Sequence, residues 1–257
     1  MHKQIVGRIL RRVSVGMLTV VTSGKGGSGK STLSVGLASA FDKLGKKVLL
    51  IDCDEGLRCL DLMLGVSDSL VFDLSDILQF DKSIDEVALK VTDNISLIPA
   101  PAEVNSYNRR TFGDFLLKTI ASFDHIIVDC PAGIDRELYS SLPSFSNLLV
   151  VETLDNVGSR SAETMETVLY ESGIKQKYLI INKFDYYMLK YNNIISLDDI
   201  VNNSGLMIKG IVPFEPQLSH LSAQGKLYHK SSSFDAFLRI AQRLEGRNID
   251  LPKLKNL

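Results

Sequence analysis

One short run of the sequence combines glycines, lysines and hydroxyls at a spacing that suits phosphate chemistry. It reads Gly24-Lys25-Gly26-Gly27-Ser28-Gly29-Lys30-Ser31-Thr32 and fits the pattern G-x-x-x-x-G-K-[ST]. Glycines let the backbone turn tightly and aim several N–H groups at one anion. In such a loop Lys30 contacts the β- and γ-phosphates, and the Ser31 hydroxyl completes the shell of a Mg²⁺ ion. The run therefore predicts a nucleoside triphosphate site.

The segments that flank this loop have the patterns that it needs. Residues 17–22 (MLTVVT) are a β-branched run, and residues 33–44 are apolar at a helical period. We therefore expect a strand, the glycine loop and a helix in direct succession. The helix should start at Thr32, with its N-terminus facing the phosphates. A glycine-rich turn that binds nothing would not need this context.

Acidic residues follow two other apolar segments at their C-terminal ends. Asp52 and Asp54 follow residues 47–51 (KVLLI), and Asp129 closes residues 125–129 (HIIVD). The carboxyl ends of the strands form the ligand-binding edge of an open α/β sheet. An apolar strand that ends in Asp, far downstream of a P-loop, is the Walker B arrangement, in which the carboxylate orders Mg²⁺ through water. For Asp52 and Asp54 the alternative is a pair of acids that cap a loop.

Strand-like and helix-like segments alternate along the whole chain. The expected strands are 17–22, 47–51, 95–98, 125–129, 148–151, 178–181 and 208–212, and the expected helices are 33–44, 73–79, 83–90, 111–121, 159–171, 196–202, 217–224 and 234–244. This alternation predicts an α/β fold, a mostly parallel doubly wound sheet with helices on both faces, in three α/β/α layers. We expect one domain over 17–247, an N-terminal extension over 1–16 and a short tail over 248–257.

The bulk properties exclude several classes of protein. The net charge of −1 gives no general reason to expect nucleic acid as a partner, and 45% hydrophobic residues suffice for a full core. Cys53, Cys59 and Cys130 lack C-x-x-C spacing and predict neither a disulfide framework nor a zinc site. Without an apolar run of membrane-spanning length or a visible signal peptide, the sequence predicts a cytoplasmic protein.

Lys25 is informative because a general P-loop does not need a lysine directly after its first glycine. The run G-K-G-G-x-G-K-S resembles the deviant Walker A motif of the MinD/ParA family of ATPases. In that family the early lysine reaches across a face-to-face dimer to the ATP of the partner. It neutralises charge on the transferred phosphoryl group, as an arginine finger does. A solvated loop lysine is the alternative explanation.

Further segments resemble the septum site-determining MinD branch of this family. They are residues 20–32, 52–62 (DCDEGLRCLDL), 129–133 (DCPAG) and 210–213 (GIVP), within a resemblance that spans 17–244. The resemblance implies a slow, Mg²⁺-dependent ATP hydrolase that a partner protein stimulates. It also implies an ATP-dependent homodimer that recruits a regulatory protein at the inner face of the cell membrane.

The resemblance also assigns roles to individual side chains. Asp54 would position or activate the attacking water, Asp52 would help to order Mg²⁺, and Asp129 would join the outer shell of the metal. Asn182 matches an asparagine that reads the adenine edge, and Pro213 lies in the loop near the adenine. The expected catalytic residues are Lys25, Lys30 and Asp54; the nucleotide-binding residues are Gly24, Lys25, Gly26, Gly27, Ser28, Gly29, Lys30, Ser31, Thr32, Asn182 and Pro213; the metal site is Ser31, Asp52 and Asp129.

Three segments depart from the MinD pattern. Cys59 replaces the asparagine of the G-L-R-N-L-D-L run, and residues 152–157 lack the N-P-E pattern. The tail 248–257 (NIDLPKLKNL) is short and broken by Pro252, so it predicts at most a weak membrane anchor. The segment 3–13 carries an apolar helical stripe beside several arginines. It could lie on an anionic membrane, pack as a terminal helix or form a leader before a start at Met17.

Three classes of function remain open at this point. The first is a MinD-like switch that positions cell division or, as in the relatives that place flagella, another polar structure. The second is a ParA-like ATPase for DNA segregation, which would need a locally basic surface that the charge balance does not favour. The third, a metal-cofactor maturation ATPase, usually has paired cysteines, and the cysteines of this chain lack that spacing.

Overall fold

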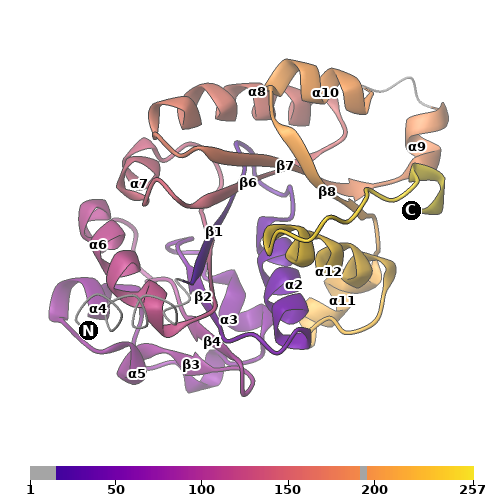
Figure 1. The fold of residues 1–257 in the computed structure, drawn as a ribbon. Helices are drawn as coiled ribbons and strands as arrows, with labels where there is room; N and C mark the ends of the chain where they lie inside the picture. Colours follow the sequence, from indigo (N-terminus) through magenta and orange to yellow (C-terminus); the bar gives the residue numbers. More distant parts are fainter. Residues whose placement is uncertain (1–15, 192–195) are drawn as a thin grey trace, which may run out of the picture.

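A computed structural model describes residues 16–191 and 196–257 of the chain. Within these ranges the strands form one eight-stranded sheet in the order β3-β4-β2-β5-β1-β6-β7-β8 (Figure 1). The strands are β1 Met17–Thr22, β2 Val48–Asp52, β3 Leu89–Lys90, β4 Ile95–Ile98, β5 His125–Asp129, β6 Asn147–Thr153, β7 Gln176–Phe184 and β8 Met207–Pro213. The predicted stripe over 3–13 lies outside the described residues.

Parallel pairing joins every neighbouring pair of strands except β3 and β4, which run antiparallel. β1 lies in the interior of the sheet between β5 and β6, so the loop that leaves its carboxyl end emerges near the middle of one sheet edge. The register pairs Asp52 with Asp129, which brings the ends of β2 and β5 side by side. The predicted doubly wound α/β fold is confirmed.

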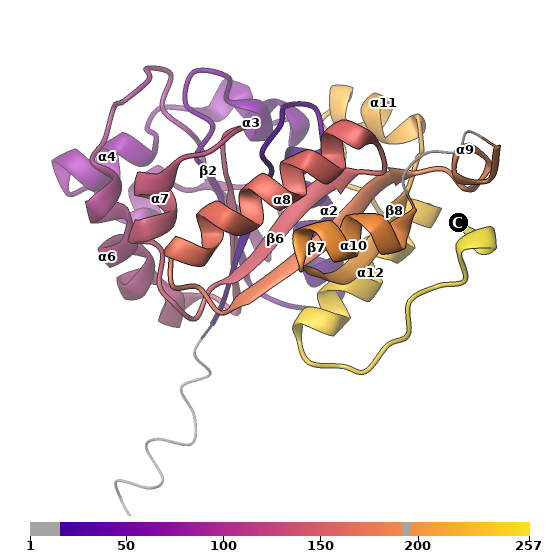
Figure 2. The same ribbon diagram turned by 90° about the horizontal axis from the view of Figure 1, so that it is seen from above.

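Helices cover both faces of the sheet (Figures 1 and 2). They are α2 Lys30–Lys43, α3 Cys59–Met63, α4 Leu74–Phe80, α5 Ile84–Val87, α6 Arg109–Thr119, α7 Arg136–Ser141, α8 Asn156–Glu171, α9 Tyr186–Tyr191, α10 Leu197–Ser204, α11 Gln217–Ala223 and α12 Ser232–Leu244. One buried cluster joins the sheet to α4, α6, α7, α8 and α10, and a second joins it to α2, α3, α11 and α12. The central strands are mostly apolar because both of their faces are buried.

The predicted element boundaries need three corrections. Helix α2 starts at Lys30 rather than Thr32. The segment 83–90, predicted as one helix, is the short helix α5 followed by strand β3, whose residues Leu89 and Lys90 pair with Leu97 and Ser96. Helices α7 and α9 were not expected. Residues 89–90 pair with 96–97 across a short turn, and this pairing, which the helical pattern of 83–90 does not reveal, makes them a strand.

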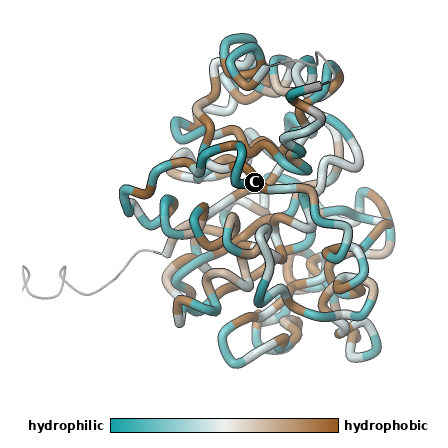
Figure 3. Tube along the Cα trace, turned by 90° about the vertical axis from the view of Figure 1, so that its right-hand side faces the viewer, coloured by the Kyte–Doolittle hydropathy of each residue, from teal (hydrophilic) through white to brown (hydrophobic). Residues whose placement is uncertain are grey.

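The C-terminal tail lies on the body of the protein, outside β8 (Figures 2 and 3). The Arg243 guanidinium donates hydrogen bonds to the carbonyl oxygens of Ile249 and Lys209, at 2.7 and 3.0 Å. Leu254 and Leu257 pack against the cluster that contains Ile200 and Ile211. Two apolar side chains of the predicted weak anchor are thus in contact with the fold, while Leu251 is exposed. Among the described helices, none is both long enough and apolar enough to span a bilayer.

Candidate functional site

The glycine loop runs from the end of β1 to the start of α2 and has the backbone shape of an anion cradle. Gly27 and Gly29 have φ values of 73° and 94°, in the left-handed region that favours glycine. At Gly29 an added Cβ would lie 2.1 Å from Asn182 Nδ2, so no larger residue fits there. Lys30, only 7% exposed, begins α2 at the N-terminus that closes the loop. This is the strand, loop and helix arrangement that the motif predicts.

Strand β7 supports the loop from one side. Asn182 Nδ2 donates to the Ser28 carbonyl at 2.8 Å, and Lys183 Nζ donates to the Gly27 carbonyl at 2.8 Å. Asn182 is buried, so its amide helps to hold the backbone of the phosphate loop. Its predicted contact with an adenine edge stays a prediction. Lys183 was missed, and its one sequence signal was its place beside Asn182 at the end of a strand.

The two strand-end acids lie side by side and are fully buried. Asp129 Oδ1 accepts a hydrogen bond from Ser34 Oγ at 2.8 Å, which ties β5 to helix α2. Asp52 accepts from the backbone N–H groups of Asp54 and Leu60, at 2.9 and 3.2 Å. The structure therefore brings the predicted metal-site carboxylates together next to the first turn of α2.

The electrostatics of this pair suit a cation. Burial, with the nearby charge of Asp129, raises the pKa of Asp52 to about 8. Burial raises the pKa of Asp129 to about 6, against hydrogen bonds from Ser31 and Ser34 that lower it. Two crowded carboxylates and a serine hydroxyl are the hard oxygen donors that Mg²⁺ prefers. Ser31, Asp52 and Asp129 thus fit the ion that the sequence predicts.

Asp54 lies in the loop that follows β2, half-buried. Burial raises the pKa of its carboxyl group, and the positive charge of Lys30 opposes that rise. Asp54 therefore lies within the field of the lysine that closes the phosphate loop. A carboxylate with a raised pKa is a better proton acceptor than an ordinary aspartate, which suits the predicted work on water.

Lys25 is directed toward the end of β6. Its Nζ lies 2.5 Å from Thr153 Oγ1 and 3.1 Å from Asp155 Oδ1. Its side chain is 19% exposed, and that of Asp155 is 46% exposed. Asp155 also caps helix α8 by accepting from the Gly158 N–H. Sequence reasoning noted this segment only for its missing N-P-E pattern and did not find Asp155.

Glu152 is another residue that the sequence did not reveal, and it is buried. Its Oε1 accepts from Ser23 Oγ at 3.1 Å and from Ser161 Oγ at 2.6 Å, while Oε2 has no hydrogen-bond partner among the residues that the structure describes. Burial raises the pKa of Glu152 to about 6, although these hydrogen bonds lower it. Glu152 therefore holds the start of the phosphate loop from β6, as Asn182 holds its end from β7.

The remaining predicted positions lie around this centre. Pro213 ends β8 opposite Phe184 of β7 and accepts from Ser233 Oγ through its carbonyl, so it lies one strand beyond Asn182. Cys59 begins α3, half-buried, and burial together with nearby acids such as Asp52 raises the pKa of its thiol.

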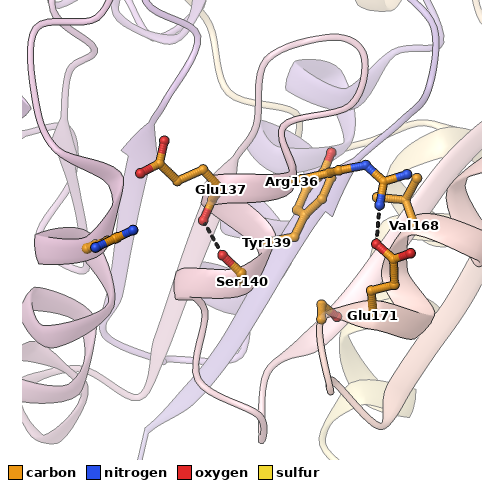
Figure 4. A pocket seen from close by; sticks show the side chains of 8 residues that line it. Arg136, Glu137, Tyr139, Ser140, Val168 and Glu171 are labelled. Carbon is orange, nitrogen blue, oxygen red and sulfur yellow. Dashed lines mark hydrogen bonds and ion pairs between the residues drawn. The ribbon is translucent and has the colours of Figure 1, made fainter.

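A separate pocket lies between helices α6, α7 and α8 (Figure 4). Figure 4 shows Arg136 directed at Glu171, with which it forms an ion pair across the pocket. The lining includes none of the predicted site residues. The phosphate-loop edge is therefore the candidate site.

The comparisons with known proteins match this geometry. The CobQ/CobB/MinD/ParA nucleotide binding domain family matches residues 19–228. The septum site-determining protein MinD of Synechocystis sp. is 33% identical over 240 residues, which cover 90% of each chain. A chain of the MinC:MinD cell division protein complex of Aquifex aeolicus has a TM-score of 0.83 at 31% identity, covering 93% of this chain and 99% of that one.

MinD from Pyrococcus horikoshii, solved with Mg-ADP, has a TM-score of 0.78 at 22% identity, covering 90% of this chain and 96% of that one, and shows the likeness of fold alone. The family match covers most of the chain, including the glycine loop and both strand-end acids. By this match and by the geometry of its phosphate loop, the chain belongs to the MinD/ParA family of P-loop ATPases.

Proposed function

We propose that this protein is a MinD-type switch, which dimerises on ATP and takes part in placing the division site or another polar structure. The observation that carries the proposal is the different surroundings of the two loop lysines. Lys30 is buried at the start of α2, whereas Lys25 turns out to a half-exposed ion pair with Asp155. A lysine that is not directed into its own phosphate loop is available for the nucleotide of a second copy.

In the proposed reaction the chain supplies binding and proton transfer. The loop N–H groups and Lys30 bind the phosphates, and Asp54 orients the attacking water and accepts its proton. Ser31, Asp52 and Asp129 would hold Mg²⁺, which supplies neutralising charge at the phosphates. Lys25 of the second copy would stabilise the charge that develops on the transferred phosphoryl group.

The relatives support a cell-division role for the switch. The Synechocystis relative is a septum site-determining protein, and the Aquifex relative forms a complex with MinC. We propose that the ATP dimer of this chain likewise recruits a regulatory protein and contacts the inner face of the cell membrane. A DNA-segregation role is the competing outcome of the test below.

Light scattering should separate the switch from a constitutive monomer or dimer. The protein should be a monomer alone and with ADP, and a dimer with Mg-ATP in the Asp54→Ala variant, which retains ATP. One mass under every condition would contradict the proposal.

The same ATP-bound variant can identify the surface that the dimer binds. We expect it to sediment with mixed phosphatidylcholine and phosphatidylglycerol vesicles, and to bind less at high salt. Because Leu254 and Leu257 pack on the body, deletion of 1–13 should reduce sedimentation more than deletion of 248–257. A shift of plasmid DNA in a gel, without binding to vesicles, would favour the DNA-segregation role instead.

A further inference from the structure

Arg109, the first residue of α6, joins the two acidic loops of the site. Its Nη2 lies 2.6 Å from Glu55 Oε2, and Glu55 directly follows Asp54 in the loop after β2. Its Nε lies 3.2 Å from Asp135 Oδ2. Asp135 is in the loop that follows Asp129, the last residue of β5. One guanidinium therefore spans the two segments that carry the predicted catalytic and metal-site carboxylates.

The contact with Glu55 is buried and well connected. The Glu55 side chain is 4% exposed and also accepts hydrogen bonds from the N–H of Asn105, the N–H of Ser106 and Ser106 Oγ. Burial alone would raise the pKa of Glu55, but the hydrogen bonds from Arg109 and Ser106 outweigh it and lower the pKa. Glu55 thus stays ionised and fixes the loop beside Asp54 to the segment that precedes α6.

The contact with Asp135 reaches the start of α7. Asp135 Oδ1 caps this helix by accepting from the Leu138 N–H at 2.9 Å, while its Oδ2 faces Arg109. The guanidinium also lies over the ring of Tyr107, 4.4 Å from its centroid, which restrains its plane. The planar guanidinium donates to two carboxylates from two different nitrogens, whereas a lysine ammonium has a single nitrogen.

We propose that Arg109 is a positioning residue that makes the loops 53–58 and 130–135 move as one unit, so that Asp54 stays in register with Asp129 during turnover. The inference rests on the proposed ATPase function. The phosphate loop has supports of its own in Asn182 and Lys183. Loss of the Arg109 bridge should therefore slow turnover and leave nucleotide binding nearly intact.

Steady-state kinetics test the first consequence. Arg109→Gln should lower kcat about tenfold to a hundredfold, with KM for ATP and the affinity for a fluorescent ADP analogue within about threefold of wild type. Arg109→Lys should recover only part of kcat. The matched control is Arg136→Gln, which removes an arginine of α7 that forms an exposed ion pair with Glu171, and it should leave kcat unchanged. An unchanged kcat in Arg109→Gln would overturn the proposal.

Amide hydrogen exchange tests the coupling without turnover. The Asp135→Asn variant retains an oxygen to cap α7 but loses the carboxylate that accepts from Arg109. It should raise exchange in 53–58 as well as in 130–135, with exchange in 24–30 unchanged. Faster exchange confined to 130–135 would overturn the coupling. Absent ATP hydrolysis in the wild-type protein would instead reject the proposed function, and the exchange result would still decide the coupling.

Discussion

Strand β5 carries a buried titratable side chain at each end, and the two side chains have different kinds of neighbours. At the amino end the ring of His125 stacks on Phe41, with centroids 3.5 Å apart, and its Nε2 lies 3.4 Å from Glu245 Oε1. At the carboxyl end Asp129 lies beside Asp52, another acid. The amino end thus pairs the ring Nε2 with an acid, whereas the carboxyl end places two acids together.

This difference implies that residues at the amino edge of the sheet mainly affect the stability of the protein, and that residues at the carboxyl edge mainly affect its function. Like charges in a buried site destabilise the free protein and are tolerated where a ligand or ion relieves them. Substitutions at the carboxyl edge should therefore change nucleotide binding or turnover without destabilising the free protein. Substitutions at the amino edge should destabilise the free protein and leave nucleotide binding and turnover unchanged. The following predictions test this division, from the largest expected effect to the smallest.

Lys30→Ala should reduce ATP affinity about a hundredfold or more, because the phosphates lose their main cation. Titration with a fluorescent ATP analogue measures the affinity, and a thermal melt without nucleotide should remain close to that of wild type. Unchanged affinity would show that the phosphate loop does not bind ATP.

Lys25→Ala should lower kcat about a thousandfold while ATP binding persists, because a lysine that acts as an arginine finger stabilises the transition state rather than bound ATP. Single-turnover hydrolysis and analogue titration measure the two properties separately. If kcat and affinity fell together, Lys25 would serve its own phosphate loop rather than that of a second copy.

Asp54→Ala should lower kcat about a hundredfold or more, through loss of the group that orients water and accepts its proton. ATP should still bind, and the ATP dimer should persist. Wild-type turnover in this variant would assign the proton to another acceptor, of which the neighbouring Asp52 is the first to test.

Asp155→Asn should have a small effect, because it removes a half-exposed ion pair with Lys25 but retains the cap of α8. Such a pair contributes about 1 kcal/mol or less. The ATP dimer should therefore form at a concentration up to about fivefold lower, as measured by sedimentation equilibrium. Weaker dimerisation would show that Asp155 helps Lys25 to reach the second copy.

The smallest effect should appear at the amino edge, as a dependence of stability on pH. Burial lowers the pKa of His125 from 6.5, although Glu245 opposes this. Below pH 6.5 the unfolded chain then binds more protons than the folded one, so stability falls as the pH decreases from 7.5 to 5.5. The loss should be about 1 kcal/mol and should disappear in His125→Gln, as measured by urea unfolding. An equal loss of stability in wild type and His125→Gln would show that another titratable group causes the pH dependence.

Several features followed from the sequence alone because they have local causes. The glycine pattern specifies a backbone with left-handed residues, which Gly27 and Gly29 adopt. Continuous apolar runs specify strands buried on both faces. Parallel strands present their carboxyl ends at one edge, so the acids that close β2 and β5 had to lie at the same edge as the phosphate loop. Composition and periodicity were sufficient for the fold class and for the centre of the site.

Only the tertiary structure determined which side chains support that centre. The contact of Asn182 with Ser28, the direction of Lys25 toward Asp155, and the bridge from Glu55 through Arg109 to Asp135 all join residues far apart in the chain. Side chains at such separations meet only after strand order and helix placement are set, and the same residues in another strand order would not meet. No periodicity within one segment encodes the segment that will lie beside it.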